Sequence, residues 1–228
     1  EKRYDMKNAE IALKDIFPQW EKLTAQEREE LMRCTEERTL TKGQFAHRGD
    51  AECTGLLLVR EGQLRVLILS ETGKEITLYR LFPWDICLFS ASCIMNDITF
   101  DIHVEAEKDT SFFVVPAQIY EKMMKQSLPI AEYTNRVMAS RFSDVMWVME
   151  QVLFKRFDSR LASFLLEQAV IEGENTLAIT HDEIARHMGS AREVVTKMLN
   201  YFSGEGIVAL SRGKIVIADE ERLREFIQ

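Results

Sequence analysis

Residues 179–198 read ITHDEIARHMGSAREVVTKM, and this stretch decides how the C-terminal part of the chain folds. Thr180 and Glu183 have the spacing of a capping box, in which two side chains accept hydrogen bonds from backbone N–H groups at the start of a helix. The box predicts a helix over His181–Met188. Gly189 tolerates left-handed backbone and is expected to end that helix in a sharp turn.

A second helix is expected to begin at Ser190 or Ala191. Its apolar side chains are predicted to face the first helix: Val194, Val195 and Met198. Its polar side chains can then reach base edges or phosphates, which makes the two helices a candidate helix-turn-helix. The alternative interpretation is an ordinary helical hairpin with a solvated polar face.

The segment that follows distinguishes the two interpretations. Glu205–Gly206 is expected to end the helical region, and Ile207–Leu210 and Lys214–Ala218 alternate in polarity around a turn at Ser211–Gly213. This pattern predicts a β-hairpin. A helix-turn-helix followed by such a wing favours a DNA-binding domain. The predicted DNA contacts are Thr180, Ser190, Arg192, Glu193, Thr196, Lys197, Arg212 and Lys214.

The chain has 228 residues and a formal net charge of -8. This charge argues against a protein that coats nucleic acid without sequence preference. It is compatible with a site-specific reader of DNA, because only the docking face has to be positive. The residues expected to make that face basic are Arg186, His187, Arg192, Lys197, Arg212 and Lys214.

No apolar run has transmembrane length, and the first residues, EKRYDMKNAE, lack the pattern of a signal peptide, so we expect a cytoplasmic protein with no membrane contact. Cys34, Cys53, Cys87 and Cys93 lack the close pairing of a zinc site. Reduced thiols are therefore expected, with neither a metal nor a cofactor. Cys87 and Cys93 are the candidate redox pair, and burial as small core residues is the alternative.

Short strands separated by turns are predicted from Thr39 to about Val115, in runs such as Leu56–Arg60, Gln63–Leu69 and Glu75–Leu81. This spacing is typical of a jelly-roll type of β-roll. Helices precede the roll, and one of them opens at a second capping box formed by Thr24 and Glu27.

One strand of the predicted roll carries three titratable side chains. Asp101, His103 and Glu105 alternate with apolar residues, so they share one face of the strand. A wet outer face is the expected explanation, and a metal site is the alternative.

Helical periodicity returns over Pro116–Lys125 and again from Pro129 to about Phe154. In the second helix apolar residues recur at alternating spacings of four and three: Met138, Phe142, Val145, Met149 and Val152. Such a seam is typical of a coiled coil and predicts a homodimer. Packing of this face against the helix's own roll is the alternative.

The expected fold is α+β: a sensor roll with N-terminal helices over 1–128, a long dimerisation helix over 129–154, and a winged helix-turn-helix over 155–228. We place a hinge near Phe154–Asp158. This order resembles the family of the cyclic AMP receptor protein and the fumarate–nitrate reduction regulator (Crp/Fnr). The likeness is carried by GQFAHRGD at 43–50, REGQL at 60–64, ITHDEIA at 179–185 and REVVTK at 192–197.

The resemblance implies a bacterial, homodimeric, non-enzymatic transcription regulator with a cyclic-nucleotide-binding-like roll. It implies double-stranded DNA with an inverted-repeat site and RNA polymerase as partners. Within the family a glutamate and a nearby basic residue contact bases, and these roles map to Glu193 and Lys197, with Arg192 beside them. Thr196 stands where a serine is common. A carboxylate can accept from cytosine N4 or adenine N6, and a cation can reach guanine.

The positions by which family members bind a cyclic nucleotide differ in this chain. The family uses a Gly-Glu and an Arg-Ser pair, and Trp84 stands where a glycine is usual. The corresponding candidate effector pocket consists of Leu88, Phe89, Phe100 and Asp101. These residues cannot neutralise a buried cyclic phosphate, so the effector is expected not to be cyclic AMP. Cys34 alone precedes the roll, which argues against the iron–sulfur cluster of the oxygen-sensing branch.

The leading hypothesis is therefore a DNA-binding regulator that responds to an unidentified effector. Two alternatives remain at this point. One is a constitutive DNA-binding factor whose roll senses nothing, and the other is a cupin-like protein that binds a metal or a small molecule.

Overall fold

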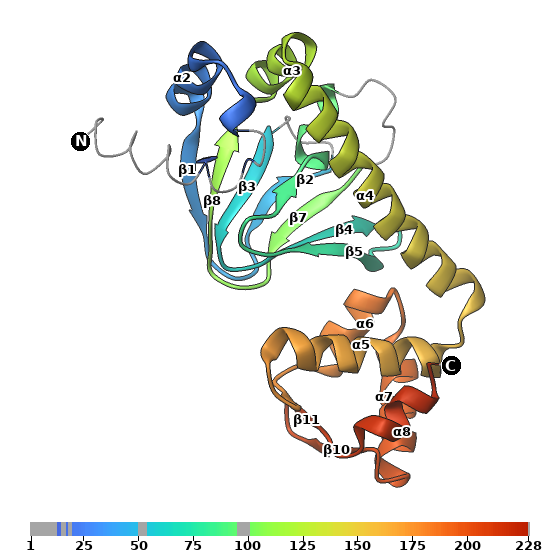
Figure 1. The fold of residues 1–228 in the computed structure, drawn as a ribbon. Helices are drawn as coiled ribbons and strands as arrows, with labels where there is room; N and C mark the ends of the chain where they lie inside the picture. The colour runs from blue at the N-terminus through green and yellow to red at the C-terminus, as the bar shows by residue number, and fades with distance from the viewer. Residues whose placement is uncertain (1–12, 15–16, 18–19, 50–53, 95–100, 228) are drawn as a thin grey trace. The chain divides into compact units, whose positions relative to one another are not determined.

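The computed structural model describes residues 13–14, 17, 20–49, 54–94 and 101–227. The chain divides into two compact units, residues 1–69 with 78–145 and residues 70–77 with 146–228. A β-rich N-terminal part, a long helix and a C-terminal group of helices with a small sheet follow one another along the chain (Figure 1), which confirms the predicted α+β class.

Two four-stranded sheets form the roll, with the strand orders β1-β8-β3-β6 and β2-β7-β4-β5. The strands are β1 (Glu36–Leu40), β2 (Phe45–Arg48), β3 (Leu56–Glu61), β4 (Leu64–Leu69), β5 (Glu75–Leu81), β6 (Ile86–Cys87), β7 (His103–Ala106) and β8 (Thr110–Val115). The three predicted runs correspond to β3, β4 and β5 within one residue at each end.

Strand β3 is buried on both faces, which explains its continuous apolar run. Leu57 and Val59 join a core with residues of β4 and β7, between the two sheets. Leu56 and Leu58 point the other way, because side chains alternate along a strand, and they join a second core with the helices.

The helices of this second core are short, except the last. They are η1 (Trp20–Lys22), α2 (Ala25–Cys34), α3 (Ala117–Gln126) and the first part of α4 (Leu128–Phe154), and η2 (Phe89–Ile94) lies between β6 and β7 in the chain. The capping box predicted at Thr24 is present at the start of α2. Neither the 27-residue α4 nor any other helix in the described part of the chain is apolar enough to span a membrane.

The prediction that Asp101, His103 and Glu105 share a solvated outer face is wrong for Glu105, which is buried. Arg65 of β4 lies opposite Glu105 in the register of the sheet, and its Nε donates to the carboxylate at 2.7 Å. Both side chains are almost fully buried. The charges compensate each other inside the roll, as buried charges must. No group of three metal-ligating side chains is found among the described residues, His103 included.

A second buried ion pair lies near the first. Arg80 Nε donates to Glu107 at 2.9 Å, and the Gln63 amide donates to the same carboxylate oxygen at 2.7 Å. The first pair joins β4 to β7 in register, and the second joins β5 to the residue that follows β7, so both connect segments that are distant in sequence.

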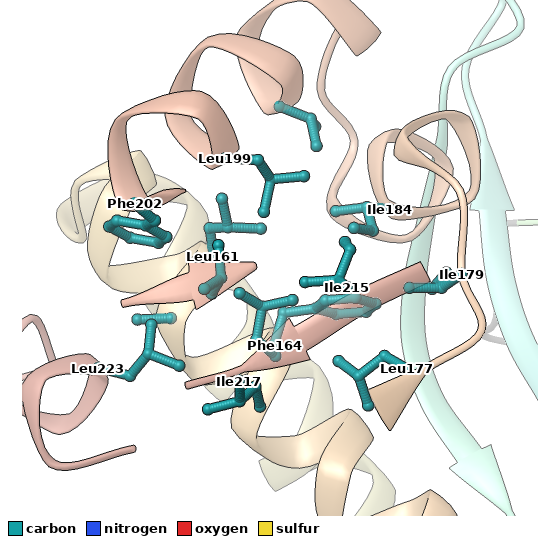
Figure 2. Close-up of a cluster of buried hydrophobic side chains, with 14 of the residues drawn as sticks. Leu161, Phe164, Leu177, Ile179, Ile184, Leu199, Phe202, Ile215, Ile217 and Leu223 are labelled. Carbon is teal, nitrogen blue, oxygen red and sulfur yellow. The ribbon is translucent and has the colours of Figure 1, made fainter. Parts of the chain in front are cut away.

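Residues 157–227, here called the C-terminal unit, form a helical group and a three-stranded sheet in the order β10-β11-β9. Its elements are α5 (Phe157–Glu172), β9 (Thr176–Leu177), α6 (His181–Met188), α7 (Arg192–Gly204), β10 (Val208–Ser211), β11 (Lys214–Ile217) and α8 (Glu220–Glu225). Figure 2 shows its core, where Leu161 and Phe164 of α5, Ile184 of α6, Leu199 of α7 and Ile215 of β11 gather. This one core holds the helix pair and the hairpin together.

Gly62, in the turn between β3 and β4, provides a test of the roll's packing. Its φ is +88°, and a Cβ there would lie 2.3 Å from the Asp109 carbonyl oxygen. Gly43 has nearly the same φ, +86°, but a Cβ at Gly43 would have none of the described atoms within 4 Å, its chain neighbours aside. We expect Gly43→Ala to cost about 1–2 kcal/mol from backbone strain. Gly62→Ala should cost about 1–3 kcal/mol more, because its methyl group also overpacks the turn.

Urea unfolding of the full chain measures both free energies. Equal losses for the two variants would contradict the close approach of the Gly62 turn to Asp109.

Candidate nucleic-acid interface

Helix α6 begins as its sequence predicts. The Thr180 backbone N–H donates to the Glu183 carboxylate at 2.8 Å, and the Glu183 backbone N–H donates to the Thr180 hydroxyl at 3.2 Å. Two otherwise unpaired N–H groups are thereby satisfied. The predicted capping box and the bounds His181–Met188 are both confirmed.

The turn after α6 is left-handed at Gly189, with φ 63° and ψ 34°. The backbone N–H groups of Gly189 and Ser190 both bond the Ala185 carbonyl, and the Arg160 guanidinium donates to the Met188 carbonyl at 2.7 Å. This role of Arg160 has no signal in the sequence, since α5 and α6 meet only in the folded unit. These bonds fix the exit of the chain from α6.

Helix α7 begins at Arg192, one or two residues later than the predicted start at Ser190 or Ala191, and Ala191 is its N-cap. Its fully buried side chains are Val195, Leu199 and Phe202. The prediction that Val194 faces inward is wrong, because that side chain is 44% exposed. Spacings of four and three from Val195 define the buried face, and Val194 lies outside that stripe.

The opposite side of α7 is polar and open. Arg192, Glu193 and Lys197 are exposed, and Thr196 is partly buried. The Arg192 guanidinium lies 3.1 Å from the Asp182 carboxylate of α6, with both side chains more than half exposed. The N-terminus of α7 adds the partial positive charge of its unpaired N–H groups. This face can therefore meet both phosphates and base edges.

The wing places two further predicted contacts on the surface. Arg212 is in the turn between β10 and β11, beside Gly213 at φ 70°, and Lys214 opens β11. Both are exposed. Thr180 is also exposed, although its hydroxyl serves the capping box, and Ser190 is partly buried in the turn. All eight predicted DNA contacts belong to the C-terminal unit, and their contacts with bases remain predictions.

The described residues of the predicted effector pocket lie in different surroundings. Leu88 is fully buried in the core beside the helices, and Phe89 is buried in the core between the sheets. Asp101 is exposed just before β7. Phe100 lies outside the described residues.

Burial also sets the chemistry of the candidate redox cysteine. Cys87 is fully buried, and burial raises the pKa of its thiol. A raised pKa keeps the sulfur in the less reactive thiol form. The side chain of Cys93 lies outside the described part of the structure, so the pair remains a prediction.

A β-roll, a long helix and a winged helix-turn-helix with an open polar recognition helix define a class of DNA-binding regulators. Comparisons with known proteins agree with this class. Residues 37–127 match the cyclic nucleotide-binding domain family, and residues 159–226 match the Crp-like helix-turn-helix domain family.

Relatives extend over most of the chain. The transcriptional regulator SdrP of Thermus thermophilus is 28% identical over 75% of this chain and 82% of its own length. The transcriptional activator protein Anr of Pseudomonas aeruginosa is 24% identical over 82% of this chain and 78% of its own. One solved crystal structure is that of a protein from Eubacterium rectale assigned to the Crp/Fnr family of transcriptional regulators. Its sequence is 53% identical to this one, and the match covers 94% of this chain and 99% of that chain, with a TM-score of 0.92.

The chain belongs to the Crp/Fnr family of transcriptional regulators, and the resemblance inferred from its sequence is confirmed. Its relatives are regulators of transcription and not enzymes.

The exposed carboxylate of Glu193 gives a direct test of the recognition helix. We expect Glu193→Ala to relax the preference for one base pair in each half-site by about 1–3 kcal/mol, the range for a lost base contact. Selection of duplex DNA followed by sequencing measures that preference. Glu174→Ala is the matched control, since it removes an exposed carboxylate from the loop before β9. Unchanged base preference in Glu193→Ala would refute the assignment.

Proposed function

We propose that this protein is a homodimeric, sequence-specific DNA-binding regulator whose roll responds to an effector other than cyclic AMP. The observation that carries the proposal is the outer face of α7, where Arg192, Glu193 and Lys197 are exposed. The opposite face of the same helix is buried in the core. A rigid helix with open donors and acceptors is what reading of a major groove requires.

An uncovered apolar stripe on α4 supports the homodimer. Phe142 and Leu153 are 65% and 62% exposed, and Met146 and Met149 between them are also exposed. Their spacings of four, three and four residues put them on one side of the helix. Such a stripe is unusual on the surface of a monomer, because burying it against a partner is favourable.

The stripe differs in part from the predicted seam. Phe142, Met149 and Val152 are exposed as the seam requires. Met138 and Val145 are partly buried against the roll's own cores, so the alternative interpretation applies to these two residues. The proposed dimer seam therefore keeps Phe142 and Met149 but includes Met146 and Leu153 in place of Met138 and Val145. A two-fold dimer of this kind would present two recognition helices to an inverted repeat.

Charge pairing inside the roll supports an effector other than a cyclic nucleotide. Arg65 and Arg80 pair with Glu105 and Glu107, and all four side chains are mostly buried. A cyclic phosphate in this interior would have to displace a carboxylate from its arginine, and a carboxylate left unpaired in a buried site is costly. Leu88 and Phe89 offer no side-chain donor in exchange.

The proposal is tested by selecting random duplex DNA with the purified, reduced protein, in the absence and presence of cyclic AMP. We expect enrichment of an inverted repeat with half-sites about one helical turn apart. Cyclic AMP should not change the enrichment. The proposal fails if no sequence is enriched, even when a small-molecule extract of cells is added to supply an effector.

The dimer is tested by a charge in the stripe. Phe142→Glu would face its own copy across the seam, and two unpaired carboxylates there would cost several kcal/mol. We expect the mass measured by light scattering after gel filtration to fall from dimer to monomer. Ser143→Glu is the control, because Ser143 is exposed one residue away, on another side of the helix. A dimer that persists in Phe142→Glu would place the interface elsewhere.

A further inference from the structure

The first turn of α6 contacts the recognition helix through side chains as well as through the core. His181 is the first residue of α6, and its ring Nδ1 lies 2.9 Å from the Thr196 hydroxyl of α7. Both side chains are partly buried. The next residue, Asp182, pairs with Arg192 one turn earlier on α7. Thr196 and Arg192, both predicted DNA contacts, are thus each bound by a side chain from the first turn of α6.

A threonine hydroxyl in a helix is not confined to one orientation by its own backbone. Its side chain divides between two rotamers, in one of which the hydroxyl bonds a carbonyl of the preceding turn. The bond to His181 selects the orientation that points across to α6. It also uses one of the hydroxyl's three hydrogen-bonding sites, so fewer sites remain for DNA and they point in fixed directions.

The tautomer of His181 decides which hydrogen-bonding sites of the Thr196 hydroxyl remain for DNA. If Nδ1 accepts, the Thr196 hydroxyl donates to the ring and its oxygen can only accept from a base, such as adenine N6 or cytosine N4. If Nδ1 carries a proton, it donates to the Thr196 oxygen, and the hydroxyl keeps its hydrogen for a base acceptor and one lone pair for a base donor. In the first case the bond leaves the hydroxyl an acceptor only, and in both cases it fixes the direction in which the hydroxyl points.

We propose that His181 is a positioning residue that determines base specificity by fixing the Thr196 hydroxyl. The inference rests on the proposed reading of DNA by α7. His181 acts through Thr196 and not by touching a base itself.

The bond is not required to hold α6 and α7 together. Ile184, Val195 and Leu199 are fully buried and join these helices in one core. The Thr180 capping box already satisfies the start of α6. A polar bond between two partly buried side chains adds little to that packing, but it does constrain the hydroxyl.

A double-mutant cycle tests the proposal. The full-length variants are His181→Ala, Thr196→Val and the pair together, and the readout is the affinity for the selected inverted repeat and for versions changed at one base pair in both half-sites. We expect Thr196→Val to reduce discrimination at one position on the order of tenfold. His181→Ala should reduce discrimination at the same position on the order of fivefold, as for one lost hydrogen bond. In the Thr196→Val background, His181→Ala should have no further effect on discrimination.

Thr196→Ser is the matched control, because it keeps the hydroxyl and should keep the response to His181→Ala. Additive effects would overturn the proposal and indicate an independent DNA contact by His181, most simply with a phosphate. A lower unfolding temperature of His181→Ala with unchanged discrimination would also overturn it, in favour of a purely structural bond.

The wild-type protein separates this proposal from the proposed function. If the wild type enriches no inverted repeat, the function fails before the cycle begins. If it does and the cycle shows no coupling, only the role of His181 fails.

Discussion

The left-handed turn at Gly189 is the constraint on which the candidate DNA interface depends. Its φ of 63° ends α6 and directs the chain into α7, so that Ile184 and Val195 join one buried core. A helix has a fixed angular period, and burying one stripe determines where every other side chain points. Burial of Val195 and Leu199 therefore turns Glu193 and Lys197 outward. The candidate recognition surface is a consequence of apolar packing on the far side of the same helix.

The roll follows a different principle. Its interior holds charges as well as apolar side chains. Arg65 pairs with Glu105 on the neighbouring strand β7, and Arg80 pairs with Glu107 directly after that strand. Since these groups satisfy one another, an effector that enters the roll must replace contacts that the protein already makes. It can shift a conformational equilibrium only by binding one state more tightly than another.

Helix α4 has apolar residues on more than one side. Met138 and Val145 are directed to the roll's cores, whereas Phe142 and Met149 remain exposed. In the proposed dimer this helix would link the interior of each roll to the seam. A change in how the roll packs on the inner residues would then alter the interface, because both sets of side chains project from the same helix. The bond between His181 and Thr196 would act later, at the step of base recognition.

Local chemistry in the sequence determined the bounds of α6, the two capping boxes, the wing and the strands β3 to β5, because each depends on hydrogen bonds or turns within a few residues. It also indicated the family through the recognition helix. The sequence could not show that Glu105 is buried, since its partner Arg65 is forty residues away and meets it only through the sheet register. Nor could it show the rotation of the exposed stripe on α4, or the bond from His181 to Thr196. Tertiary structure decided these, because a periodic pattern shows which residues share a face but not what that face meets.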